Sequence, residues 1–270
     1  MSTSERANAC LRSFQVAFRS ELDSAVANVC REGPFRVLDC PCGDGFYTRL
    51  IAQHLPGGVL VAADASPDLL RLAQHHVPRR PSAVEIDFID ADVYRLPFDD
   101  AHFDLVWCAQ SFITLSEPVQ ALVELGRVTK PGGRIAVLET DVYHHVLLPW
   151  PVELELSLFK AVRDECRKRY GSAGKFAQAR RLRKAFHDAG LMSVERRTLA
   201  MDRTAPFDKA TRKFLEHHLD YLRDFLRPAL TQHEMNALDR FADPNSAENL
   251  TNSPDVDLTC LATVSIAVRK

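Results

Sequence analysis

Short apolar runs alternate with helical segments between residues 34 and 139, and the first two runs end at acids, Asp39 and Asp64. Strands that alternate with helices form βαβ units, whose right-handed crossovers give a parallel sheet covered on both faces. We therefore predict a doubly wound α/β fold. Five strands are expected in this part of the chain, at 35–39, 59–63, 84–89, 103–108 and 134–138.

The rest of the chain is less regular. Two more strands are expected at 194–199 and 258–268, which would complete a mostly parallel, seven-stranded sheet with helical cap insertions. The expected organisation begins with an N-terminal helical segment (1–33, with one helix at 4–29), followed by a cofactor-binding α/β core (34–139) and a cap insertion (140–174). A core helix and strand come next (175–203, with the helix at 175–189). A helical cap insertion (204–257) and a final core strand (258–270) complete the chain.

Composition excludes several classes of protein. The chain has 270 residues, of which 46% are hydrophobic and 26% charged, and its net charge of -2 gives no general attraction to nucleic acid or anionic membranes. No secretory leader and no apolar run of membrane-spanning length is visible, so we expect a cytoplasmic protein with reduced thiols. The spacing of Cys40 and Cys42 is not that of a zinc or redox motif, and no metal site is expected.

The segment from Val37 to Gly45 joins a buried strand to a helix through a glycine turn. Glycines let the backbone approach a ligand closely, and the helix N-terminus offers unpaired N–H groups to an anion. Asp64, at the end of the second strand, is placed to accept both ribose hydroxyls of a nucleoside. A purely structural strand-to-helix turn, with Asp64 as an ordinary first-turn acid, would also account for these residues.

Two later motifs follow in order, Asp92-Val93-Tyr94-Arg95-Leu96-Pro97-Phe98 with Phe103-Asp104-Leu105-Val106, and Arg127-Val128-Thr129-Lys130-Pro131-Gly132-Gly133. Together with Asp39, Gly43, Gly45 and Asp64, this ordered set resembles the class I S-adenosylmethionine-dependent methyltransferases. The resemblance is to the small-molecule group that includes the ubiquinone and menaquinone C-methyltransferases. It covers about half the chain and implies a Rossmann-like methyltransferase fold.

The resemblance implies roles for individual residues. The glycine turn, with Asp39, Cys40, Pro41, Gly43 and Gly45, would pass under the methionine part of S-adenosylmethionine. Asp64 and Ala65 would hold the ribose, Asp92 and Val93 the adenine, and Gln110 would lie near the sulfonium. Pro41 stands where the family usually has its first glycine and lacks an N–H, so cofactor contacts must fall on other groups.

The methyl acceptor should be a small molecule bound near the carboxyl ends of the strands, under the two cap segments. A positioned base helps when the acceptor must lose a proton. The candidates directly after the fifth strand are Asp141, Tyr143, His144 and His145, with His217 further along. His218 shares a helical face with Phe214 and Phe225, so a packed histidine is the better interpretation.

The sequence is also compatible with functions of other classes. A nicotinamide-dependent oxidoreductase is disfavoured because the sequence after Gly43 and Gly45 lacks the third glycine of the dinucleotide motif. A protein that binds S-adenosylmethionine without transfer remains open, and so does a methyltransferase acting on tRNA or protein. The basic stretch between Arg163 and Lys184 is interpreted as a solvated helix face, because no aromatic-rich RNA motif accompanies it. No nucleic-acid partner is expected.

Overall fold

The computed structural model describes residues 1–31, 33, 35–77, 83–141, 146–172 and 177–270. The chain divides into two compact units. One contains the sheet and is formed by Leu22–Thr140, Gln178–Leu199 and Ala262–Lys270. The other is mainly helical and is formed by Met1–Glu21, Asp141–Ala177 and Ala200–Leu261. Two strands, β7 (Val194–Thr204) and β8 (Asp257–Val268), contribute to both units.

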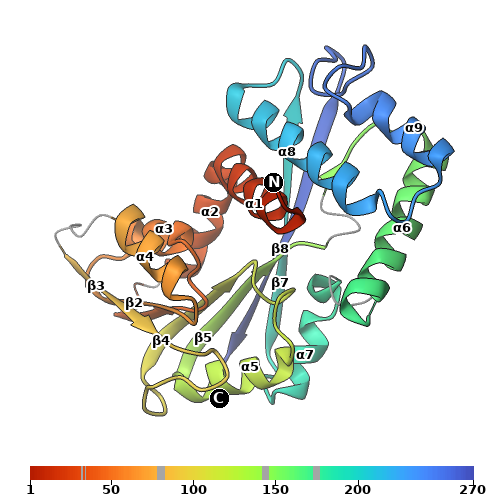
Figure 1. The fold of residues 1–270 in the computed structure, drawn as a ribbon. Coiled ribbons are helices and arrows are strands. Elements are labelled where there is room, and N and C mark those ends of the chain that lie inside the picture. Colours follow the sequence, from red (N-terminus) through yellow and green to blue (C-terminus); the bar gives the residue numbers. More distant parts are fainter. Residues whose placement is uncertain (32, 34, 78–82, 142–145, 173–176) are drawn as a thin grey trace. The chain divides into compact units, whose positions relative to one another are not determined.

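Five parallel strands form the body of the sheet unit (Figure 1). They are β1 (Arg36–Asp39), β2 (Gly58–Asp64), β3 (Val84–Asp90), β4 (Phe103–Ala109) and β5 (Thr129–Glu139). Their order is β3-β2-β1-β4-β5, followed by β8, which runs antiparallel to β5 and also pairs with β7. The order reverses direction between β1 and β4, and open sheets of this kind bind ligands outside the carboxyl ends of the strands at that point.

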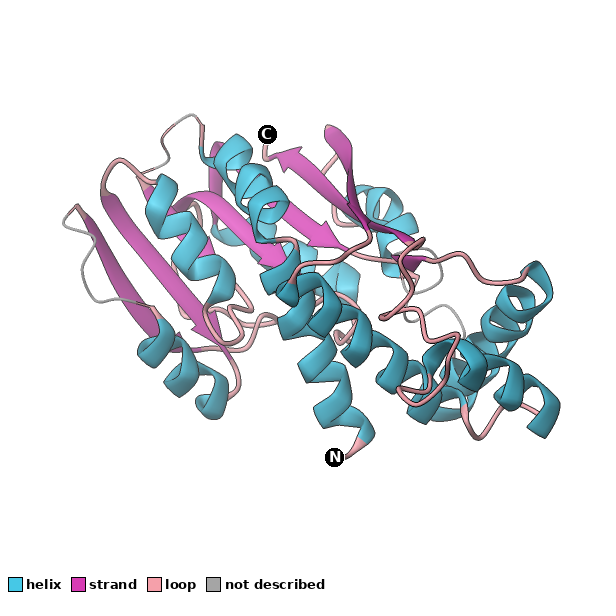
Figure 2. Cartoon of the chain, turned by 90° about the horizontal axis from the view of Figure 1, so that it is seen from above, coloured by secondary structure: helices cyan, strands magenta, loops and turns pink. Residues whose placement is uncertain are grey.

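Helices cover both faces of this sheet (Figures 1 and 2). On one face lie α3 (Phe46–His54) and α4 (Pro67–His76), and on the other lie α5 (Pro118–Val128) and α7 (Leu182–Asp188). The start of α4 is fixed by its own residues, because the Ser66 hydroxyl accepts the Leu69 N–H and Pro67 occupies the first turn. The core between the layers is built from side chains such as Leu38, Val106 and Phe186, all without exposed surface.

The helical unit contains α1 (Thr3–Ala17), α6 (Val152–Tyr170), α8 (Lys209–Leu226) and α9 (Gln232–Ala242). Phe14 and Phe18 pack against Phe214 of α8, with ring centroids 5.6 and 5.5 Å apart. The guanidinium of Arg203 lies 4.6 Å from the centre of the Phe18 ring and bonds to Glu21. The short β6 (Val146–Leu147) pairs with the part of β8 that belongs to this unit.

Three predicted elements differ from the structure. The helix predicted at 4–29 is two helices, α1 and α2 (Arg19–Cys30), separated at Phe18, whose side chain is buried in the aromatic cluster. The strand predicted at 134–138 is longer, because β5 begins at Thr129 and Gly132 and Gly133 bond to the backbone of Arg269. The helix predicted at 175–189 contains α7 and a separate 3-10 turn at Gln178–Arg180 within the described residues.

Candidate functional site

The glycine turn after β1 is bound to the acid that ends β2. Oδ2 of Asp64 accepts the Gly43 N–H at 2.9 Å, and Oδ1 accepts the Ser66 N–H at 2.9 Å. The Cys42 N–H donates to the carbonyl of Ala63 at 2.9 Å. The backbone therefore holds Asp64 and the turn as one rigid element, although Pro41 contributes no N–H.

The two glycines of the turn have different surroundings. Both have positive φ, +57° at Gly43 and +83° at Gly45. A Cβ at Gly45 would lie 2.8 Å from Cγ2 of Val77 and 3.0 Å from Cα of Ala73, so this glycine lets α3 pack on α4. A Cβ at Gly43 would meet nothing within 4 Å. Gly43 therefore borders open space, as a cradle for a ligand requires.

These groups fit the adenosyl part of S-adenosylmethionine. Each Asp64 oxygen uses one backbone donor and keeps acceptor capacity, since an ionised carboxylate offers about four lone-pair sites. Asp92 follows β3 and is exposed, and its Oδ1 accepts the Tyr94 N–H at 3.0 Å. The Ala91 N–H donates to the carbonyl of Asp64, which joins the two acidic segments.

Two further acids are buried at the carboxyl ends of β1 and β5. Oδ2 of Asp39 accepts the Thr48 hydroxyl at 2.6 Å, and burial together with the nearby Asp64 raises the pKa of Asp39 to about 7. Burial raises the pKa of Glu139 to about 8, although Oε1 accepts the Phe112 N–H at 2.6 Å. This edge of the sheet therefore holds acids whose charge responds to a nearby cation.

Gln110 lies beside these acids, directly after β4. Its backbone has a positive φ of 52°, and its N–H donates to the carbonyl of Leu138 at 2.8 Å. Its side-chain oxygen accepts the Tyr47 hydroxyl at 3.1 Å. Tyr47 is buried in the first turn of α3, so the helix that begins at the glycine turn contacts the segment after β4.

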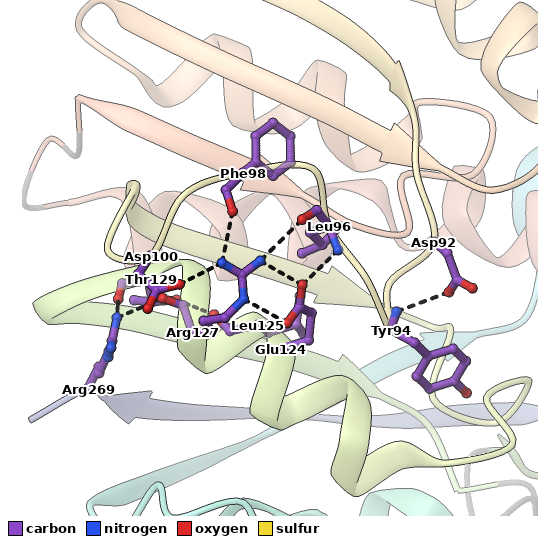
Figure 3. Close-up of polar contacts among 10 residues, drawn as sticks. All are labelled: Asp92, Tyr94, Leu96, Phe98, Asp100, Glu124, Leu125, Arg127, Thr129 and Arg269. Atoms are coloured by element: carbon purple, nitrogen blue, oxygen red, sulfur yellow. Dashed lines mark hydrogen bonds and ion pairs between the residues drawn. The ribbon is translucent and has the colours of Figure 1, made fainter.

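The later sequence motifs are joined to one another by Arg127 (Figure 3). Its guanidinium donates to the carbonyls of Leu96 and Phe98 at 3.1 and 2.8 Å, and to Glu124 and Asp100. Glu124 in turn accepts the Leu96 N–H at 2.7 Å. Because the five N–H donors of arginine have a fixed planar arrangement, this side chain anchors the loop after Asp92 to α5.

Asp104, in the Phe-Asp-x-Val motif, has a similar anchoring role. Its carboxylate accepts the N–H groups of Phe35 and Arg36 at 3.1 and 2.7 Å and the Lys130 ammonium at 2.6 Å. The last two motifs thus hold loops and strand ends in place.

The predicted catalytic residues remain predictions. Asp141 is described and follows β5 by two residues, whereas Tyr143, His144 and His145 lie outside the described residues. Nδ1 of His217 lies 3.1 Å from the carbonyl of Ala9 and 3.1 Å from the Ser13 hydroxyl. His218 is 5% exposed and packs against Phe214, as the sequence predicts.

Comparison with solved structures gives the fold. The structure resembles that of a protein of Bacillus halodurans C-125 described as a candidate methyltransferase, with a TM-score of 0.57, 18% identity, and coverage of 91% of this chain and 99% of the other. The fold is therefore the Rossmann-like methyltransferase fold predicted from the sequence, and within the described residues the sheet has eight strands, of which β1 to β5 are parallel.

Comparison of sequences shows which proteins residues 38–137 are similar to. Residues 38–137 match the family described as methyltransferase domain. A demethylmenaquinone methyltransferase of Thermus thermophilus is 37% identical over 115 residues, which are 43% of this chain and 51% of the relative. The ubiquinone/menaquinone biosynthesis C-methyltransferase UbiE of Ectopseudomonas mendocina is 38% identical over 105 residues, 38% of this chain and 41% of the relative.

The chain thus spans about half the length, or less, of these curated relatives. The resemblance stated from the motifs is confirmed, because residues 38–137 match the methyltransferase-domain family, for which S-adenosylmethionine is the implied methyl donor. In the part of the chain that the structure describes, no helix has the length and apolar character needed to cross a membrane.

Sequence reasoning missed several residues of this region. Glu139 ends β5 as Asp39 and Asp64 end their strands, so the recurrence of an acid at a strand end was a usable signal. The hydroxyls of Thr48 and Tyr47 gave no such signal, because their partners are distant in the sequence. The anchoring role of Arg127 could not be derived either, since it depends on how α5 packs beside the loop at 96–100.

Proposed function

We propose that this chain transfers the methyl group of S-adenosylmethionine to a small-molecule acceptor with an O, N, S or C nucleophile, by in-line displacement. The observation that carries the proposal is the pairing of Asp64 with the glycine turn, where the carboxylate keeps acceptor capacity beside open space at Gly43. The ordered motifs of the methyltransferase domain support it.

In this proposal the residues have the roles that the family resemblance implies. Asp64 and Ala65 hold the ribose, and Asp92 and Val93 hold the adenine. Asp39, Cys40, Pro41, Gly43 and Gly45 line the methionine part, and Gln110 lies next to the reacting end. When bound, the donor supplies an electrophilic methyl group on a positively charged sulfur, and the acids around it favour that charge.

The acceptor we favour is a quinol or a related phenol. The curated relatives that match the domain are named for demethylmenaquinone and for ubiquinone and menaquinone biosynthesis. Oxygen methylation of such a ring releases the hydroxyl proton, and carbon methylation releases the proton of the methylated ring carbon. A positioned base accelerates such a proton loss about 10²–10⁴-fold. Asp141, Tyr143, His144 and His145 are our candidates for that base. Fixing the acceptor in line with the methyl group contributes further, roughly 7–11 kcal/mol in favourable cases.

The proposal is tested by incubating the protein with S-adenosylmethionine labelled in its methyl group. Reduced naphthoquinols, phenols, amines and thiols serve as acceptors, with tRNA and a protein mixture as macromolecular acceptors. We expect label in a small molecule together with an equal amount of S-adenosylhomocysteine. Label confined to tRNA or protein, or donor binding without transfer to any acceptor, would contradict the proposal.

A further inference from the structure

Glu139 is hydrogen-bonded to the bend at Ser111 and Phe112 that follows β4. Its side chain has no exposed surface, and its Oε1 accepts the Phe112 N–H at 2.6 Å, while the backbone N–H groups of Ser111 and Thr140 also act to lower its pKa. These donors come from the bend and from the residue that follows β5. Oε2 is buried and has no hydrogen-bond partner among the described residues. An unpaired buried oxygen is costly, so its retention calls for an explanation.

The bend held by Glu139 presents Gln110. A residue other than glycine at positive φ costs roughly 1–2 kcal/mol, so the conformation of Gln110 needs support from its surroundings. The Leu138 carbonyl and the Glu139 carboxyl supply it from β5. Tyr47 then reaches Gln110 from α3. Glu139 therefore stabilises the connection between the segment after β4 and the helix that follows the glycine turn.

Within the described residues, the titratable groups whose pKa responds to Glu139 are neutral or acidic. Tyr47 of α3 and Cys108 of β4 are both buried, and the proximity of Glu139 raises the pKa of each further. Asp39 of β1 acts on Tyr47 in the same direction. From β8, the Thr263 hydroxyl bonds to the backbone carbonyl of Glu139. None of these groups is a cation, so a bound cation would be the one that ionises the carboxyl.

We propose that Glu139 is a positioning and donor-selecting residue, which holds the Gln110 bend and, once ionised, favours a sulfonium over the neutral thioether of the product. The proposal rests on the function proposed above. It follows from the place of Glu139 at the carboxyl end of β5, beside the β1/β4 reversal where the ligand of such a sheet lies.

A proton balance follows from this arrangement. With a pKa of about 8, the carboxyl is mostly protonated at pH 7 in the free protein. Binding of the sulfonium releases this proton to solvent, so the affinity for S-adenosylmethionine rises with pH below 8. S-adenosylhomocysteine carries the same amino acid and adenosine groups without the sulfur charge. Its affinity stays nearly constant, and the ratio of the two affinities changes by up to about tenfold per pH unit.

The test is calorimetric titration of both compounds at pH 6, 7 and 8, in buffers of different ionisation enthalpy so that released protons are counted. The wild type should release close to one proton with S-adenosylmethionine at pH 7 and almost none with S-adenosylhomocysteine. Glu139→Gln should abolish the release and flatten the pH dependence, with product affinity changed by less than about threefold. Glu85→Gln, an exposed acid on β3, is the matched control and should behave as the wild type.

Asp39 is the competing proton source because its pKa is also raised. The proposal is supported if proton release on binding of S-adenosylmethionine persists in Asp39→Asn and is lost in Glu139→Gln. Release that survives in Glu139→Gln, equal release with both compounds, or an equal loss of affinity for both compounds in Glu139→Gln overturns it. If Glu139→Gln does not fold, equal proton release in the wild type still overturns it. Failure of the wild type to bind either compound would instead refute the proposed function.

Discussion

The Gly43 N–H donates a 2.9 Å hydrogen bond to Oδ2 of Asp64, so the turn after β1 and the acid at the end of β2 form one structural element. The two residues are 21 positions apart in the sequence and are brought together by the parallel pairing of β1 with β2. A ligand that occupies the space beside Gly43 therefore lies next to a carboxylate. The predictions below depend on this relationship and on the acids near it.

Asp64→Ala should weaken binding of S-adenosylhomocysteine by at least about 100-fold, because two hydrogen bonds from ribose hydroxyls to a charged acceptor contribute roughly 1.5–3 kcal/mol each. Fluorescence titration measures the affinity, and circular dichroism checks that the fold is retained. Asp68→Ala is the control, since Asp68 is an exposed acid at the start of α4 that pairs with Arg71. Equal affinity of Asp64→Ala and Asp68→Ala would remove Asp64 from the site.

Alanine at Gly45 should mainly lower stability, whereas alanine at Gly43 should mainly lower the affinity for the ligand. Gly45→Ala should destabilise the fold by about 2 kcal/mol or more, because positive φ is unfavourable and the new methyl group collides with α4. Gly43→Ala should cost only the conformational penalty of about 1 kcal/mol but place a methyl group in the ligand space. Urea unfolding and product titration on both variants measure the two effects. A larger loss of affinity in Gly45→Ala than in Gly43→Ala, at equal folded fraction, would be inconsistent with this assignment.

Buried acids give the stability an unusual pH dependence. The pKa values of Asp39 and Glu139 are raised to about 7 and about 8 in the folded state, whereas the unfolded chain loses these protons near pH 4. The folded state therefore binds more protons across this range, and the contribution of each acid to stability falls as pH rises from about 4.5 to its folded pKa. The slope is at most about 1.4 kcal/mol per pH unit for each group.

Glu139→Gln removes one of these contributions. The free energy of unfolding of this variant, relative to the wild type, should rise between pH 5 and pH 8. In this range the wild type loses stability, because its folded state retains a proton on Glu139 that its unfolded state has released, and the variant has no such proton. Urea denaturation at pH 5, 6, 7 and 8 measures this difference. A difference that stays constant or falls over that range would show that Glu139 is ionised in the folded protein without cost.

Arg127→Lys should lower the free energy of unfolding by about 2–3 kcal/mol, although it preserves the charge. A lysine ammonium cannot reproduce the planar set of hydrogen bonds to Leu96, Phe98 and Glu124, and the carbonyls lose their partners. Arg71→Lys is the control, because the Arg71 side chain is 74% exposed and its pair with Asp68 contributes little. Similar stability of the two variants would mean that the loop at 96–100 is held by other contacts.

Much of the fold could be predicted because each signal was local. The apolar runs that form β1 and β2 and the acid that ends each of these strands lie within a few residues of one another. The alternation of such runs with helical segments then defined the order of elements. The strand β5 was the exception, since Pro131, Gly132 and Gly133 have the composition of a turn and extend the strand only because Arg269 of the C-terminal segment pairs with them.

Contacts between distant residues explain what could not be predicted. The break between α1 and α2 is stabilised by Phe18 packing on Phe214, almost 200 positions away, so helical periodicity alone could not reveal it. The roles of Asp104 and Arg127 depend on backbone N–H and carbonyl groups from other elements, which no side-chain pattern encodes. The buried state of Glu139 likewise depends on the bend at Ser111 and Phe112.

The central claim is that the element formed by Gly43 and Asp64 binds an adenosyl-sulfur compound. Calorimetric titration of the wild-type protein with S-adenosylhomocysteine, and separately with NADH, tests it most directly. We predict saturable binding of S-adenosylhomocysteine at one site per chain and no binding of NADH. Binding of NADH, or no heat of binding with S-adenosylhomocysteine at any concentration up to the millimolar range, would contradict the claim.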